Sequence, residues 1–117
     1  MASAVKIFHN PHCSKSRQTM QLLDSNGVMP DIIDYLKQPP SYHELAQTLE
    51  LLGLEPRELM RTHEKPYKEN RLDDQDLSRE QLIQAMIEHP ILIERPIVIH
   101  DGKAVIGRPP EKVLDIL

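Results

Sequence analysis

The most reactive side chain in this 117-residue sequence belongs to its single cysteine, Cys13. It follows a short apolar stretch and directly precedes a segment with helical spacing. The start of a helix has unpaired backbone N–H groups and the positive end of the helix dipole, and both favour negative charge. A thiol in such a place tends to have a lowered pKa, and its thiolate is the nucleophile. The same N–H groups favour binding of a tetrahedral oxyanion.

Polar residues surround this cysteine in the sequence. An isolated cysteine is more often an inert small hydrophobic residue, but Cys13 lies in a polar loop rather than in an apolar run. His9, Ser16 and Arg17 could tune the thiolate or donate hydrogen bonds to a bound anion. A metal site at His9, His12 and Cys13 is disfavoured because adjacent ligands fit poorly around one tetrahedral ion and no second Cys/His pair has zinc spacing. We expect no metal.

Three arginines lie at the ends of predicted elements. Arg61 ends a short helix, Arg95 precedes a strand and Arg108 follows a hairpin. Guanidinium groups bind oxyanions through two parallel hydrogen bonds, which lysine cannot do. Residue types and spacing alone leave open whether these arginines converge on Cys13, because most arginines are solvated surface residues.

Hydrophobic periodicity and turn residues predict the elements that must position these side chains. Strands are predicted over 5–8, 31–36, 97–100 and 103–106, with Asp101-Gly102 as a two-residue hairpin turn between the last two. Helices are predicted over 14–26, 42–52, 56–61 and 79–88, with capping boxes at Ser41 and Ser78, and a last short helix follows Pro109-Pro110. The polar segment 62–76 is interpreted mainly as loop or broken helix.

This order predicts an α/β protein of the thioredoxin-like class. A βαβ unit with a parallel strand pair and a ββα unit with an antiparallel pair would form one mixed four-stranded sheet. Residues 41–89 would be a helical insertion within a single domain over 1–117, which suits a chain of this length.

Composition excludes several classes of function. The formal net charge of −4 argues against a nucleic-acid binder. The longest apolar runs are far too short for a membrane span, and the N-terminal residues lack the apolar region of a signal peptide. A single cysteine cannot form an intramolecular disulfide, which fits a reducing, cytoplasmic setting.

Five stretches together resemble the ArsC family of glutaredoxin-coupled arsenate reductases, particularly its short YfgD-like members. They are I-F-H-N-P-H-C-S-K-S-R-Q-T, Y-L-K-Q-P-P-S, L-M-R-T-H-E-K-P-Y, H-P-I-L-I-E-R-P-I-V and G-R-P-P-E-K-V-L-D-I-L, which follow the family order along nearly the whole chain. The resemblance implies that Cys13 is the nucleophile and that Arg61, Arg95 and Arg108 hold the oxyanion. It also implies that His9, Ser16 and Arg17 flank the active loop, and that the Arg95-Pro96 peptide is cis.

The resemblance further implies the reaction. The Cys13 thiolate would attack arsenate, glutathione would attack the adduct as co-substrate, and glutaredoxin would recycle the thiol as arsenite leaves. No bound cofactor is implied. The single cysteine is consistent with this scheme, because a chain that resolved its own intermediate would need another thiol.

Two other functions fit parts of the sequence. Cys13 and Ser16 form a C-x-x-S motif, which suits a monothiol thiol–disulfide oxidoreductase that would not need the three arginines. Transcription regulators of the Spx type share the expected fold, but they often carry a C-x-x-C switch where this chain has Ser16.

Overall fold

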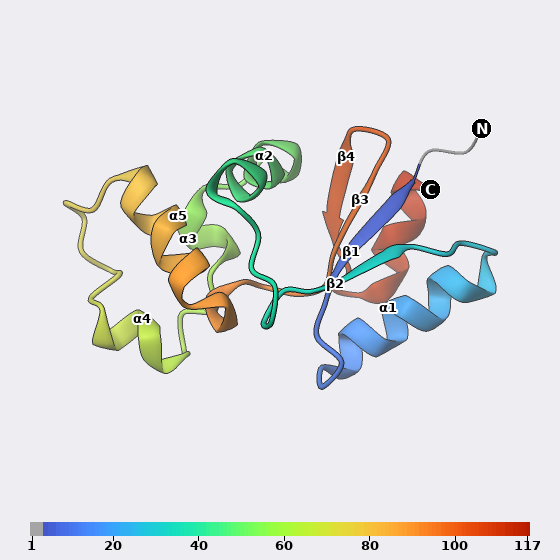
Figure 1. The fold of residues 1–117 in the computed structure, drawn as a ribbon, viewed down its shortest axis with the longest axis horizontal. Coiled ribbons are helices and arrows are strands. Elements are labelled where there is room, and N and C mark those ends of the chain that lie inside the picture. The colour runs from blue at the N-terminus through green and yellow to red at the C-terminus, as the bar shows by residue number, and fades with distance from the viewer. Residues whose placement is uncertain (1–3) are drawn as a thin grey trace. The chain divides into compact units, whose positions relative to one another are not determined.

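The computed structural model describes residues 4–117, which fall into two compact units (Figure 1). One unit combines the chain up to Gln38 with Arg95–Leu117 and contains all four strands. The other, Pro39–Glu94, is helical and corresponds to the insertion predicted over 41–89. The single domain expected over 1–117 stays a prediction.

The first unit is built on a mixed sheet with the strand order β2-β1-β3-β4. Strand β1 (Val5–His9) pairs in parallel with β2 (Asp31–Asp34) and antiparallel with β3 (Ile97–His100). Strand β3 pairs antiparallel with β4 (Lys103–Ile106). Asp101 and Gly102 connect them with φ angles of 52° and 72°, the left-handed backbone that a tight two-residue turn requires. The predicted four-stranded mixed sheet is confirmed.

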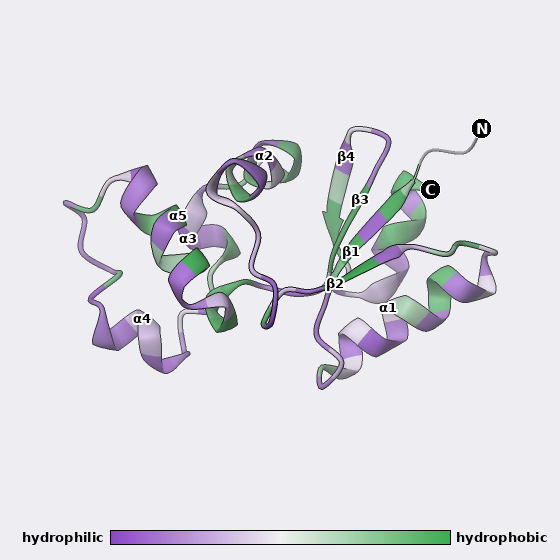
Figure 2. Cartoon of the chain, in the orientation of Figure 1, coloured by the Kyte–Doolittle hydropathy of each residue, from purple (hydrophilic) through white to green (hydrophobic). Residues whose placement is uncertain are grey.

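Helix α1 (Ser14–Ser25) and the C-terminal 3₁₀ helix η2 (Pro110–Ile116) cover one face of this sheet (Figure 1). The core between them contains Ile7 of β1, Val98 of β3, Leu23 of α1 and Val113 of η2, all fully buried. Figure 2 shows the strands as largely hydrophobic ribbons and α1 as a mixture of hydrophilic and hydrophobic residues. This packing fixes the N-terminal end of α1 beside the end of β1, where Cys13 lies.

The helical unit contains α2 (Tyr42–Leu52), α3 (Pro56–Leu59), α4 (Lys65–Glu69), α5 (Arg79–Glu88) and the 3₁₀ turn η1 (Pro90–Leu92). The N-cap hydroxyls predicted for two of these helices are confirmed, because Ser41 accepts from the N–H of Glu44 and Ser78 from that of Gln81. The largest buried side chains of this unit form an aliphatic core, listed here: Leu45, Leu49, Leu59, Ile83, Met86, Leu92 and Ile93.

Several predicted boundaries were wrong. The helix predicted over 56–61 ends at Leu59, because Met60 is extended and forms a β-bridge with Ile93. The strand predicted over 31–36 ends at Asp34, whose carbonyl oxygen accepts hydrogen bonds from two N–H groups in the turn that follows. The helix predicted over 14–26 ends one residue earlier. The short helix predicted after Pro109-Pro110 is present and is of the 3₁₀ type.

The polar segment 62–76 contains one short helix, α4, with a proline in its first turn. This agrees with the broken helix that was one of the two interpretations of the segment. Within residues 4–117, no helix has the length and apolar character that a membrane crossing requires.

Candidate active site

Cys13 is the N-cap residue of α1. Its backbone is extended (φ −97°, ψ 124°), its N–H donates to the carbonyl of Asn10 at 3.0 Å, and its own carbonyl accepts the N–H of Arg17. The side chain of Asn10 accepts from the N–H of His12 at 2.9 Å, and Arg17 Nη1 donates to the carbonyl of Pro11 at 3.0 Å. The loop before the helix is therefore held in one shape by its own polar groups.

The Cys13 thiol lies where hydrogen-bond donors and positive charge meet. Its residue is 8% exposed, and this burial raises the pKa of the thiol. The N–H of Ser16, the guanidinium charge of Arg95, the N–H of Lys15 and a hydrogen bond from the Arg95 side chain lower it, and together they outweigh burial. The pKa of Cys13 is therefore lower than that of an ordinary thiol. N–H groups that favour a thiolate also favour other anions placed at the same helix end.

His9 and Ser16 connect the end of β1 to the first turn of α1. His9 Nδ1 lies 2.6 Å from the Ser16 hydroxyl oxygen, which also accepts the N–H of Asn10 at 3.0 Å. Ser16 is fully buried. Burial lowers the pKa of His9, the Asp34 carboxylate raises it, and Arg17 lowers it, so that the imidazole has a pKa below its ordinary value.

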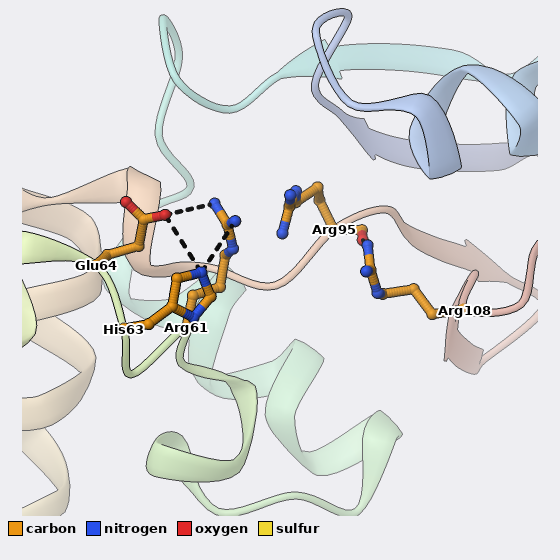
Figure 3. A network of polar contacts seen from close by, with 5 residues as sticks. All are labelled: Arg61, His63, Glu64, Arg95 and Arg108. Carbon is orange, nitrogen blue, oxygen red and sulfur yellow. Dashed lines mark hydrogen bonds and ion pairs between the residues drawn. The ribbon is translucent and has the colours of Figure 1, made fainter.

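Arg95 and Arg108 belong to the same unit as Cys13. Arg95 contacts the thiol as described above, and Arg108 Nη1 donates to the carbonyl oxygen of Arg95 at 3.4 Å (Figure 3). Both arginines precede cis prolyl peptides, Arg95-Pro96 and Arg108-Pro109. The first cis bond was predicted, and the second was not.

Arg61 belongs to the helical unit, where its backbone and side chain are both fixed. Its N–H donates to the carbonyl of Leu92 at 2.7 Å, beside the bridge between Met60 and Ile93. Its Nη1 lies 3.1 Å from Oε1 of Glu64, and its Nη2 lies 3.4 Å from Nε2 of His63 (Figure 3). The Nε atom of Arg61 is buried and has no hydrogen-bond partner among residues 4–117.

The structure thus brings six of the predicted site residues into one unit. These are His9, Cys13, Ser16, Arg17, Arg95 and Arg108. Arg61 lies in the other unit. The roles predicted for these side chains in binding and catalysis stay predictions.

Two residues near the site were missed by the sequence reasoning. The charge of Asp34 raises the pKa of His9. Pairing the first two predicted strands in register would have placed these two residues side by side. Gly107 packs against Thr19 and Pro96, and no local sequence signal indicates this contact. As for metal chemistry, residues 4–117 include no group of three His, Cys, Asp or Glu side chains that could hold an ion.

Comparison with known proteins gives the chain its family. The ArsC family model matches residues 8–116. The chain is 54% identical to the protein named YfgD of Escherichia coli (strain K12), over 100% of this chain and 99% of the relative. It is 51% identical to a protein named arsenate reductase of Haemophilus influenzae, over 97% and 99% of the two chains.

A solved structure agrees with these relatives. The structure titled arsenate reductase from Vibrio cholerae superposes with a TM-score of 0.96, at 52% identity and with complete coverage of both chains. The chain belongs to the ArsC family, and its fold is the α/β thioredoxin-like fold that the element order predicted.

Proposed function

We propose that this protein reduces arsenate to arsenite, with Cys13 as the nucleophile. The observation that carries the proposal is the placement of the Cys13 thiol at the start of α1, where the N–H groups of Lys15 and Ser16 and the side chain of Arg95 lower its pKa. Membership of the ArsC family and close relatives named arsenate reductase support arsenate as the oxyanion.

The first step is attack by the Cys13 thiolate on arsenic. A sulfur–arsenic bond forms, and one oxygen leaves as water after it takes up protons. The guanidinium groups of Arg61, Arg95 and Arg108 neutralise the arsenate oxygens in this step, and the N–H groups at the start of α1 add further positive potential. Charge-assisted bidentate hydrogen bonds would fix the direction of attack as well as add affinity.

External thiols complete the reaction, because the chain has a single cysteine. Glutathione displaces a second oxygen from arsenic and forms a second sulfur–arsenic bond. A glutaredoxin thiolate then attacks the glutathione sulfur, a mixed disulfide forms, and the electron pair of the broken bond reduces As(V) to As(III). Hydrolysis of the remaining sulfur–arsenic bond releases arsenite and restores the Cys13 thiol.

The test is arsenate-dependent NADPH oxidation in the presence of glutathione, glutathione reductase and glutaredoxin. The wild-type protein should turn over, and the Cys13→Ser variant should match the blank without protein. The same proteins assayed on a glutathione mixed disulfide without arsenate test the monothiol oxidoreductase alternative. Turnover of the mixed disulfide with none on arsenate would overturn the proposal.

A further inference from the structure

Asp34 and His9 lie directly opposite each other at the ends of neighbouring parallel strands. The register of β1 and β2 pairs Ile7 with Ile32 and His9 with Asp34. Side chains alternate along a strand, so His9 lies on the same face as Ile7, and Asp34 shares that face. Ile7 packs in the core beneath α1, and His9 contacts Ser16 of the same helix. The carboxylate of Asp34 therefore lies on the face of the sheet that carries the active loop.

One oxygen of the Asp34 carboxylate, Oδ1, is buried and has no hydrogen-bond partner among residues 4–117. Leaving a buried polar oxygen unpaired destabilises a fold, and more so for a charged group. The Asp34 carboxylate favours the cationic form of His9 and so raises the pKa of the imidazole. Arg17 on α1 has the opposite effect. A costly group at this position suggests a role beyond folding.

The hydrogen bonds of the Ser16 hydroxyl indicate this role. The Ser16 oxygen already accepts the N–H of Asn10, so its own hydroxyl hydrogen needs an acceptor. Nδ1 of His9, at 2.6 Å, is that acceptor when the neutral imidazole carries its proton on Nε2. In the other tautomer, Nδ1–H would donate to an oxygen that already accepts once, and the hydroxyl hydrogen of this fully buried serine would lose its partner.

We infer that Asp34 is a positioning residue of the active site, whose carboxylate holds the proton of His9 on Nε2 and thereby fixes the Ser16 hydroxyl. The field of the carboxylate favours the tautomer whose N–H lies nearer to Asp34, and we assign that N–H to Nε2 because Nδ1 lies against the Ser16 hydroxyl. Ser16 is the residue whose backbone N–H donates to the Cys13 thiol. A fixed Ser16 side chain keeps that N–H directed at the sulfur. The catalytic meaning of this chain of contacts rests on the proposed role of Cys13.

The first experiment measures the tautomer directly. In protein with ¹⁵N-labelled histidine, the His9 ring nitrogens of the wild type should show the Nε2–H tautomer when neutral. Asp34→Ala should lower the population of that tautomer and lower the pKa of His9, and Asp34→Glu should restore both. Asp31→Ala is the matched control, because Asp31 lies on the same strand but pairs with Lys6 on the opposite face. A wild type with Nδ1–H, or an Asp34→Ala variant with unchanged His9 signals, would overturn the inference.

The second experiment separates positioning from simple charge. Loss of a nearby negative charge should by itself lower the pKa of Cys13. Loss of a positioned Ser16 N–H should raise it. We expect the midpoint of the pH profile of Cys13 alkylation to rise in Asp34→Ala and to stay unchanged in Asp31→Ala. A lowered or unchanged midpoint in Asp34→Ala would contradict a positioning role.

Neither experiment requires turnover. Asp34→Ala keeps the backbone carbonyl of Asp34, which accepts two N–H groups of the turn after β2. Thermal unfolding checks that the Asp34→Ala variant is folded. If that variant does not fold, Asp34→Asn, which removes the charge at constant size, takes its place in both experiments. A protein that shows the His9 and Cys13 changes but does not reduce arsenate would contradict the proposed function and leave this inference standing.

Discussion

A methyl group added to Gly107 would lie 2.7 Å from the hydroxyl oxygen of Thr19 and 2.9 Å from Cγ of Pro96. Thr19 is fully buried, and its hydroxyl donates to the carbonyl of Lys15 at 2.9 Å. Gly107 in turn donates its N–H to the carbonyl of Pro96 at 3.0 Å. The residue before Arg108 thus holds the end of β4 close to both α1 and the prolyl loop that follows Arg95.

Substitution of Gly107 should therefore destabilise the protein. Gly107→Ala places a methyl group among stiff, buried neighbours, and such overpacking costs about 1–3 kcal/mol. Urea unfolding of the wild type, Gly107→Ala, Thr19→Ala and the double variant measures this. The double variant should recover part of the loss because one of the two clashes is removed. Strictly additive effects of the two substitutions would contradict the proposed contact.

Removal of the Arg95 side chain should make Cys13 less reactive. Arg95→Gln deletes both the positive charge and the charge-assisted hydrogen bond that lower the pKa of the thiol. A hydrogen bond to a charged group is worth about 1.5–3 kcal/mol, so the alkylation rate at neutral pH should fall roughly tenfold or more. The exposed Arg79, which pairs with Glu55, provides the control variant Arg79→Gln. Equal alkylation rates in the wild type and Arg95→Gln would contradict the assignment.

Substitution of Arg61 should separate arsenate reduction from general thiol chemistry. If Arg61 holds the oxyanion, Arg61→Ala should raise the KM for arsenate roughly 10- to 100-fold, as expected when a charge-assisted pair is lost. Turnover of a glutathione mixed disulfide should change little. The Arg79→Ala variant of the same helical unit should leave both activities near wild type. An Arg61→Ala variant with normal arsenate kinetics would contradict the role of Arg61 in holding the oxyanion.

His9 should make stability depend on pH in a defined direction. Its pKa is lower in the folded state than in the unfolded chain, chiefly because of burial. Between these two pKa values the unfolded state binds more protons, so the free energy of unfolding rises with pH. The contribution of His9 is fully present above the unfolded pKa of about 6.5 and is lost as the pH falls through the folded pKa. The slope is at most about 1.4 kcal/mol per pH unit.

Unfolding of the wild type and His9→Gln between about pH 5 and pH 7 measures this contribution, because 6.5 is the ordinary pKa of histidine. The difference in stability between the two proteins should grow in favour of the wild type as the pH rises. A difference that shrinks over this range would show that the folded state raises the pKa of His9.

Local sequence patterns predicted much of this fold. The alternation at Val5–Phe8, the Asp101-Gly102 turn and the serine N-caps depend on neighbours within four residues, and the structure confirms them. The position of Cys13 before a helix was predictable for the same reason. Element ends were less predictable because distant partners determine them. Met60, for example, leaves the helix to pair with Ile93, which lies 33 positions later.

The missed site residues also depend on contacts between distant parts of the chain. Asp34 is placed beside His9 only by the register of two strands that lie far apart in the sequence. Gly107 contacts Thr19 from the far end of a hairpin. Before the strands are paired, Asp34 is one of many carboxylates in the sequence, and the stretch that begins with Gly107 gives no sign of the contact with Thr19.

The central claim is that the fold presents Cys13 as an activated thiolate, and the pH dependence of Cys13 alkylation tests it most directly. The rate constant of reaction with iodoacetamide should follow a single titration whose midpoint lies clearly below the ~8.5 of a free cysteine. The Cys13→Ser variant, which lacks the thiol, should not react at all. A midpoint at or above that of free cysteine would contradict the account.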